Sequence, residues 1–254
     1  TSESREYHAG LAAMLGIQAA LAAQRGYAAE ESILETQRGF FAVYGDTDGA
    51  SVTRGLGDSW DIITDMAIKL VSGGHPSHSL AEAAANAARV GQISPDDVET
   101  ITLSRPGVTA LTGPIHPTDL IDMAHSPASF LAAGAADHEF SWSHATEAKI
   151  TDPVIHQLID KVQVGTQPTQ QVEEYKQGAT VSIQTKDGRT FSSTVFAPKG
   201  AGALGIDWAD VDTKYRSLIP GVGLSDQQIE GSLKVIHNFG NVKHVSELID
   251  LLRL

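Results

Sequence analysis

The stretch KLVSGGHPSHSLAEAAANAA, residues 69–88, places a glycine pair, two histidines and three serines before a run of alanines. Alanine is the strongest helix former, so the run predicts a helix that extends from Ala81 to Arg89. Ser79 and Glu82 fit the S-x-x-E pattern of a capping box, which predicts that this helix begins at Ser79. The turn before it is either an ordinary helix start or one wall of an active site.

Composition narrows the class of protein. Of the 254 residues, 41% are hydrophobic and 19% are charged, which is typical of a globular protein. The net charge of −13 argues against a nucleic-acid partner, because such binding relies on clustered Lys and Arg. A small anionic substrate remains compatible with it, since a local basic pocket dominates within a Debye length of about 8 Å. The chain has no cysteine, which excludes disulfides, thiolate metal sites and a cysteine nucleophile.

The sequence predicts a soluble protein with a cytoplasmic location and no membrane partner. No apolar run reaches the roughly 18 residues that a membrane span needs. The first ten residues, TSESREYHAG, lack the basic and apolar regions of a signal peptide.

The N-terminal part of the chain predicts helices. Residues 7–25 consist of strong helix formers and are apolar on almost every face. Such a helix is normally buried on all sides, so we expect its packing partners to lie outside this chain. Further helices are expected over residues 29–36 and 59–66, with a loop over residues 40–51.

The middle of the chain predicts strands as well as helices. Alternating hydrophobicity predicts a strand over residues 98–103. Two alternating segments within residues 178–196 flank Asp187 and Gly188, the turn pair of a β-hairpin. Helices are predicted over residues 117–137, with a break at Pro127, from Asp152-Pro153 onward, and over residues 206–219, 225–239 and 245–254.

The turn before the opening helix offers an anion site with an acid/base group. Gly73 and Gly74 let the backbone bend sharply and approach a ligand, and helix N-terminal N–H groups suit a carboxylate or phosphate. Lys69 precedes the turn, and His75 and His78 lie within it. The alternative is that these histidines bond only to the backbone. No third metal ligand is recognisable near them, so we predict neither a metal nor a cofactor.

Seven segments resemble the MmgE/PrpD family, in family order across nearly the whole chain. That family includes 2-methylcitrate dehydratase, cis-aconitate decarboxylase and iminodisuccinate epimerase. The match looks like the C-terminal half or so of a family member. The segments are YHAGLAAMLGIQAALAAQRGY, ILETQRGFFAVYGD, GLGDSWDI…AIKL, GGHPSHSLAEAAANAA, DPVIHQLIDKVQV, TKDGRTFSSTVFAPKGAG and DVDTKYRSLI.

The resemblance implies a mainly α fold with an inserted α+β lid domain, which agrees with the predicted order of helices and strands. Residues 1–75 would belong to the helical domain, residues 76–199 would form the lid domain, and residues 200–254 would return to the helical domain. The active site would lie between the two domains. We also expect a homodimer, in which a separate N-terminal portion could complete the site.

The resemblance also implies roles for the opening stretch. Lys69 and His78 match the lysine and histidine of the family motif. His78 is therefore predicted to be the catalytic acid/base, and Lys69 the partner of a substrate carboxylate or a second base. The predicted substrate-binding residues, whose N–H groups would cradle a carboxylate, are Gly74, His75, Ser77 and Ser79.

Three functions stay open at this point. The prediction is a dehydratase-type lyase that abstracts a proton next to a carboxylate of a small, 2-methylcitrate-like polycarboxylate. The alternatives are an epimerase of an amino-polycarboxylate such as iminodisuccinate, and a non-catalytic binding or assembly subunit. Cis-aconitate decarboxylases carry a lysine and a tyrosine where this chain aligns Met14 and Ser129, and both departures argue against decarboxylation.

Overall fold

The computed structural model describes residues 4–45, 50–60 and 67–254. The chain divides into two compact units, residues 1–64 and 65–254, and each is described by itself. Most of the helix expected over residues 59–66 lies outside the described residues.

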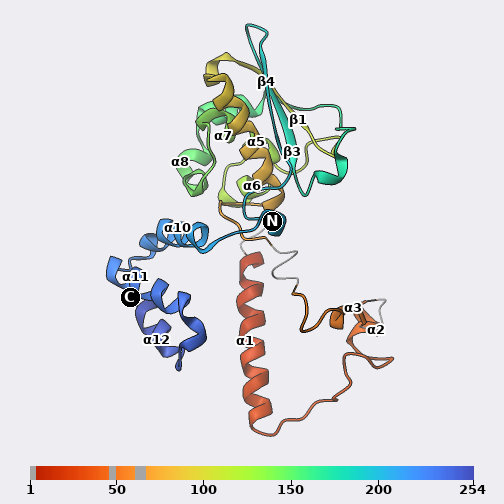
Figure 1. The fold of residues 1–254 in the computed structure, drawn as a ribbon, viewed down its shortest axis with the longest axis vertical. Coiled ribbons are helices and arrows are strands. Elements are labelled where there is room, and N and C mark those ends of the chain that lie inside the picture. Colours follow the sequence, from red (N-terminus) through yellow and green to blue (C-terminus); the bar gives the residue numbers. More distant parts are fainter. Residues whose placement is uncertain (1–3, 46–49, 61–66) are drawn as a thin grey trace. The chain divides into compact units, whose positions relative to one another are not determined.

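The described residues of the first unit form the helices α1 (Ser4–Gln24), α2 (Phe40–Tyr44) and α3 (Ala50–Thr53) (Figure 1). The helix predicted over residues 7–25 is confirmed as α1. Its burial is not, because apolar side chains such as Ile17, which is 64% exposed, are not covered within this unit.

The helix expected over residues 29–36 is wrong, and this segment forms turns. Its carbonyl groups bond elsewhere: those of Ile33 and Leu34 accept the N–H groups of Phe40 and Phe41 at 2.8 and 3.0 Å. An isolated segment of this length is too short to be a stable helix. Residues 46–49 of the loop predicted over residues 40–51 lie outside the described residues; the described part of it contains the short helix α2 and the start of α3 instead.

The second unit is built on a four-stranded sheet with the order β2-β1-β3-β4. Strand β1 pairs with β2 in parallel and with β3 antiparallel, and β3 and β4 form an antiparallel hairpin. The strand and the hairpin predicted from alternation are therefore confirmed. The strands are β1 (Val98–Ser104), β2 (Val162–Val164), β3 (Ala179–Thr185) and β4 (Thr190–Val195).

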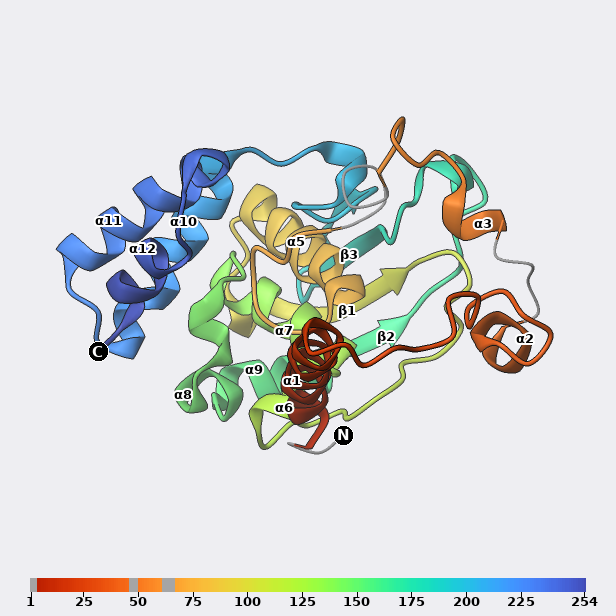
Figure 2. The same ribbon diagram turned by 90° about the horizontal axis from the view of Figure 1, so that it is seen from below.

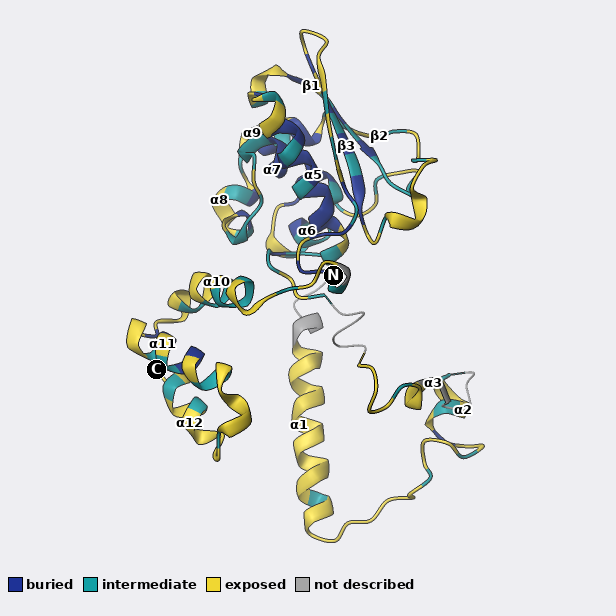
Figure 3. Cartoon of the chain, viewed as in Figure 1, coloured by how far each residue is buried: buried dark blue, intermediate teal, exposed yellow. Residues whose placement is uncertain are grey.

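Helices α5 (His75–Gly91) and α7 (Pro127–Asp137) cover one face of this sheet (Figure 2). Figure 3 shows that the buried residues of the unit concentrate in these two helices and in the sheet. Ten residues of α5 are buried, six of them alanines. A Cβ at Gly134 of α7 would collide with the backbone of Ala81, so the two helices can approach closely only because that position is glycine.

Other predicted boundaries are also found. Ser126 caps α7 directly after α6 ends, which confirms the break at Pro127, and Asp152 caps α9. The other α-helices formed by the described residues are α6 (Leu120–Ala124), α8 (Glu147–Ile150), α9 (Pro153–Ile159), α10 (Trp208–Leu218), α11 (Asp226–His237) and α12 (Ser246–Ile249). Short 3₁₀ turns lie at Pro95–Asp97, Trp142–Ala145, Val172–Glu174, Gly202–Leu204, Ile219–Val222, Phe239–Asn241 and Asp250–Leu252.

The predicted start of α5 is wrong by four residues. The helix begins at His75, and Gly74 is its N-cap. Pro76 favours this earlier start, because proline suits the first turn of a helix. Ser79 does not act as a cap, since its hydroxyl donates a hydrogen bond of 2.6 Å to the carbonyl oxygen of Gln177.

The fold is thus mainly α with a small mixed sheet. The lid domain and its boundaries at residues 76 and 199 stay a prediction, as does the cytoplasmic location. In the described part of the chain, no helix is long and apolar enough to cross a membrane.

Gly134→Ala tests the close packing of α5 and α7. The added methyl group meets the backbone of Ala81, so we expect the free energy of unfolding to fall by about 1–3 kcal/mol. Gly231→Ala is the matched control, because its Cβ meets only the end of the Leu251 side chain, and it should change stability by less than about 1 kcal/mol. Urea denaturation measures both; equal effects of the two variants would contradict this packing.

Candidate functional site

The turn that precedes α5 is held in place from three directions. The N–H of Ile68 donates to the carbonyl of Gly200, and that of Gly74 donates to the carbonyl of Ala124, both at 2.9 Å. Gly73 has a φ of +85°, and a Cβ at this position would collide with the ring of Phe130. Only glycine fits such a conformation at such a close contact.

The two histidines of the turn form a hydrogen-bonded pair. Nδ1 of His75 lies 3.3 Å from Nδ1 of His78, and Nε2 of His78 lies 3.1 Å from the carbonyl oxygen of Ser72. A carbonyl oxygen only accepts, so Nε2 of His78 carries the hydrogen and its Nδ1 is the acceptor. His75 therefore donates from Nδ1, and its Nε2 carries the lone pair.

Burial keeps His78 neutral at physiological pH. Only 4% of this residue is exposed, and burial, followed by the neighbouring charge on His75, lowers its pKa to about 4. His75 is half-buried, and burial lowers its pKa as well. A neutral imidazole is the form that can accept a proton.

Lys69 is exposed and places a positive charge near both histidines and a second lysine. Burial is the main cause that lowers the pKa of His75 and of Lys214, and the positive charge of Lys69 is the second cause for both groups. It also contributes to the lowered pKa of His78. The Lys214 ammonium lies 5.4 Å from the centre of the Trp142 ring. The sequence interpretation missed Lys214, although it lies in one of the segments that resemble the family.

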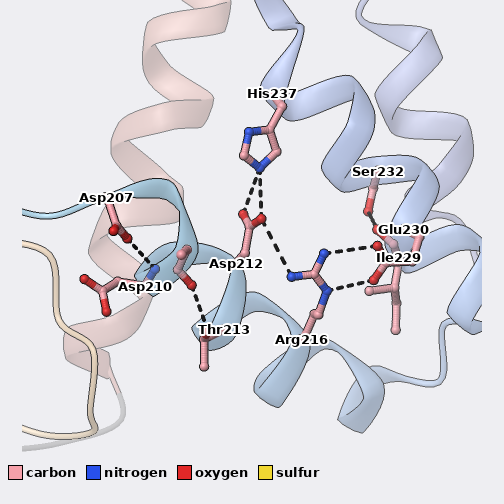
Figure 4. A network of polar contacts seen from close by, with 10 residues as sticks. Asp207, Asp210, Asp212, Thr213, Arg216, Ile229, Glu230, Ser232 and His237 are labelled. Atoms are coloured by element: carbon pink, nitrogen blue, oxygen red, sulfur yellow. Dashed lines mark hydrogen bonds and ion pairs between the residues drawn. The ribbon is translucent and has the colours of Figure 1, made fainter.

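A polar network holds α10, which carries Lys214, against α11 (Figure 4). Asp212 accepts a hydrogen bond of 2.9 Å from Nε2 of His237. Arg216 donates from Nε to Glu230 at 2.8 Å. Both carboxylate contacts join the two helices, so they fix the helix from which Lys214 extends.

The predicted substrate-binding residues differ in what they can offer. The N–H of Gly74 is engaged by Ala124, and that of Ser77 by the carbonyl of Gly74 at 2.9 Å. Ser79 is fully buried, and its hydroxyl is used by Gln177. The geometry thus brings Lys69, His75 and His78 together, whereas the predicted binding roles of Gly74, Ser77 and Ser79 stay predictions.

His78 also borders a cavity of about 250 Å³. Charged side chains of both signs line it, including Glu82, Glu139 and Lys199. Among residues 4–45, 50–60 and 67–254, no three His, Cys, Asp or Glu side chains gather as a metal site would require.

Comparisons with known proteins agree with the resemblance. A family model described as the MmgE/PrpD C-terminal domain matches residues 73–236. Cis-aconitate decarboxylases of Homo sapiens and Mus musculus are each 24% identical to the chain over 99% of its length. The alignments cover 53% of those proteins, so the chain spans about half the length of these curated relatives.

His78→Gln tests the neutral state of the buried histidine. An unfolded histidine binds a proton near pH 6.5, whereas folded His78 does so only near pH 4. The unfolded state therefore binds more protons between these values, and this residue lowers stability as pH falls from 6.5 towards 4. We expect the urea midpoint of the wild type to fall more than that of His78→Gln between pH 7 and pH 5; parallel declines would contradict this.

Proposed function

The chain belongs to the MmgE/PrpD family, and from this premise we propose that it contributes the acid/base side of an enzyme site for a small polycarboxylate. The proposed reaction is that of a dehydratase-type lyase. A proton leaves a carbon next to a carboxylate, a hydroxyl leaves the neighbouring carbon, and a C=C bond and water form.

One geometric observation carries the proposal: Nδ1 of His75 lies 3.3 Å from Nδ1 of the buried His78. The charge of Lys69 is among the causes that lower the pKa of both histidines and of Lys214. A polycarboxylate needs more than one cation, and Lys69 and Lys214 supply two. Proton removal next to a carboxylate also needs a base, which the adjacent histidine pair supplies. The same cations would stabilise the negative charge that develops on the substrate.

The proposal gives the two histidines different roles. Nε2 of His75 carries the lone pair and would take the proton from carbon. His75 would then return that proton to the departing hydroxyl, which leaves as water. His78, which the sequence predicts to be the acid/base, is here assigned a positioning role instead, because its Nδ1 accepts from His75 while the Ser72 carbonyl oxygen accepts from its other nitrogen. Lys69 keeps its predicted role as the partner of a substrate carboxylate.

Decarboxylation is a second candidate, and the names of the two relatives favour it. Loss of CO₂ leaves a carbanion that the same cations would stabilise. Met14 and Ser129, which this chain aligns with a lysine and a tyrosine of cis-aconitate decarboxylases, argue against it. Epimerisation needs only the proton to return on the other face. The expected homodimer belongs to this proposal too, as does a separate N-terminal portion that would complete the site.

Proton exchange tests the proposed base. In D₂O with 2-methylcitrate, we expect the wild type to replace the proton next to the carboxylate with deuterium and to form the dehydrated product. His75→Ala and Lys69→Ala should each lower the exchange rate about 10²-fold or more. His244→Ala, at an exposed residue, is the control and should keep the wild-type rate.

NMR spectra of the substrate measure exchange, and CO₂ release measured in parallel distinguishes decarboxylation. Exchange without a dehydrated product would indicate epimerisation. Exchange that persists in both His75→Ala and Lys69→Ala would rule out the assigned site. A wild-type chain without exchange or CO₂ release on polycarboxylates would favour the binding or assembly subunit.

Lys214→Ala tests the second cation. Since Lys214 is proposed to bind a carboxylate and not to transfer the proton, we expect KM to rise about 10-fold or more while kcat changes less. Lys214→Arg should retain part of the affinity. The control is Lys234→Ala, at an exposed position of α11; an unchanged KM in Lys214→Ala would remove this residue from the site.

A further inference from the structure

Helix α5 borders a second cavity, of about 450 Å³, that shares no residue with the cavity beside His78. This volume lies within the range of small-molecule sites, which begins at about 300 Å³. The walls come from the first turns of α5, the end of β1 and the segment that follows it. Prominent among the lining residues are Ser77, Leu80, Leu103, Arg105, Leu111 and Thr112.

Among the described residues that line this cavity, Arg105 is the one Lys, Arg, Asp or Glu side chain. Its Nη1 donates to the carbonyl oxygen of Pro76 at 2.8 Å. Within the described residues, none of the ion pairs found involves Arg105. The guanidinium has five N–H donors, and the Pro76 contact uses one, so donors remain for an anion.

The guanidinium is also costly to bury without an anion. Arg105 is half-buried, and burial lowers its pKa. Burying a charge is unfavourable unless it is paired. The described residues that line the cavity include neither Asp nor Glu, so none of them offers the guanidinium a counter-charge.

The rest of the lining is largely apolar. Leu80 and Leu103 are each 2% exposed, and Val108 and Leu111 pack against the hydrophobic core. Such walls suit a hydrocarbon chain better than a strongly hydrated ion like inorganic phosphate. A planar guanidinium pairs with a carboxylate through two parallel hydrogen bonds.

We propose that this cavity binds a small organic carboxylate with a short apolar chain, its carboxylate on Arg105 and its chain against Leu80, Leu103 and Leu111. Gly74 and Ser77, which the sequence predicts to bind substrate, also line this cavity, whereas its lining residues do not include His75 or Lys69. Hexanoate binding at Arg105 needs no proton transfer, so a failure of this proposal would leave the proposed reaction standing.

Calorimetric titration of the full chain with hexanoate tests the proposal, with hexanamide as the neutral probe of similar shape. We expect saturable hexanoate binding and at least 10-fold weaker hexanamide binding. Arg105→Gln should weaken hexanoate binding at least 10-fold, because the charge is lost. Arg189→Gln, which removes the same charge from the hairpin tip, and Lys69→Ala should bind as the wild type does.

Ala110→Phe provides a second variant that leaves the half-buried Arg105 in place. Ala110 lines the cavity and is exposed, so the larger side chain should fill space there and reduce hexanoate binding while the circular dichroism spectrum stays unchanged. Three results would overturn the proposal: no hexanoate binding to the wild type, equal binding of hexanamide, or full binding in both Arg105→Gln and Ala110→Phe.

Discussion

The close approach of α5 and α7 is the constraint on which the rest of the structure depends. Gly134 lets α7 lie against the backbone of Ala81, and the alanines of α5 bring the helix close to the sheet. The same approach places the ring of Phe130 against Gly73. Packing of small residues thus fixes the backbone turn that carries His75 and His78. The positions of these two histidines therefore depend on the packing of the hydrophobic core.

The sequence predicts those parts of the fold whose causes are local. The hairpin around Asp187-Gly188 needs only alternation and a turn pair, and α9 needs only its capping Asp152. The start of α5 fails because it is decided elsewhere: the Ser79 hydroxyl finds the carbonyl of Gln177, almost a hundred positions away. A capping pattern cannot reveal that its serine already has a partner.

The candidate site also contains some residues that the sequence predicts and others that only the fold reveals. Lys69, His75 and His78 lie within ten residues, so one segment was enough to predict them together. Lys214 comes from α10 and Arg105 from the end of β1, and only the fold brings them towards that segment. The neutral state of His78 was equally hidden, since it depends on burial. Residue type and spacing thus predict which groups are present, while the protonation state and the distant cations require the structure.

The lack of acidic partners for Lys69, Lys214 and Arg105 contrasts with the acidic composition of the chain. The chain carries a net charge of −13, so acidic partners for a lysine or arginine are plentiful. Yet among the described residues no ion pair with a carboxylate is found for Lys69, Lys214 or Arg105. All three influence or contact the first turn of α5 or the segment before it. In the described part of the chain these three cations lie around one helix start without an ion-paired carboxylate, and both the proposed polycarboxylate site and the proposed carboxylate cavity at Arg105 depend on this shortage of internal counter-charge.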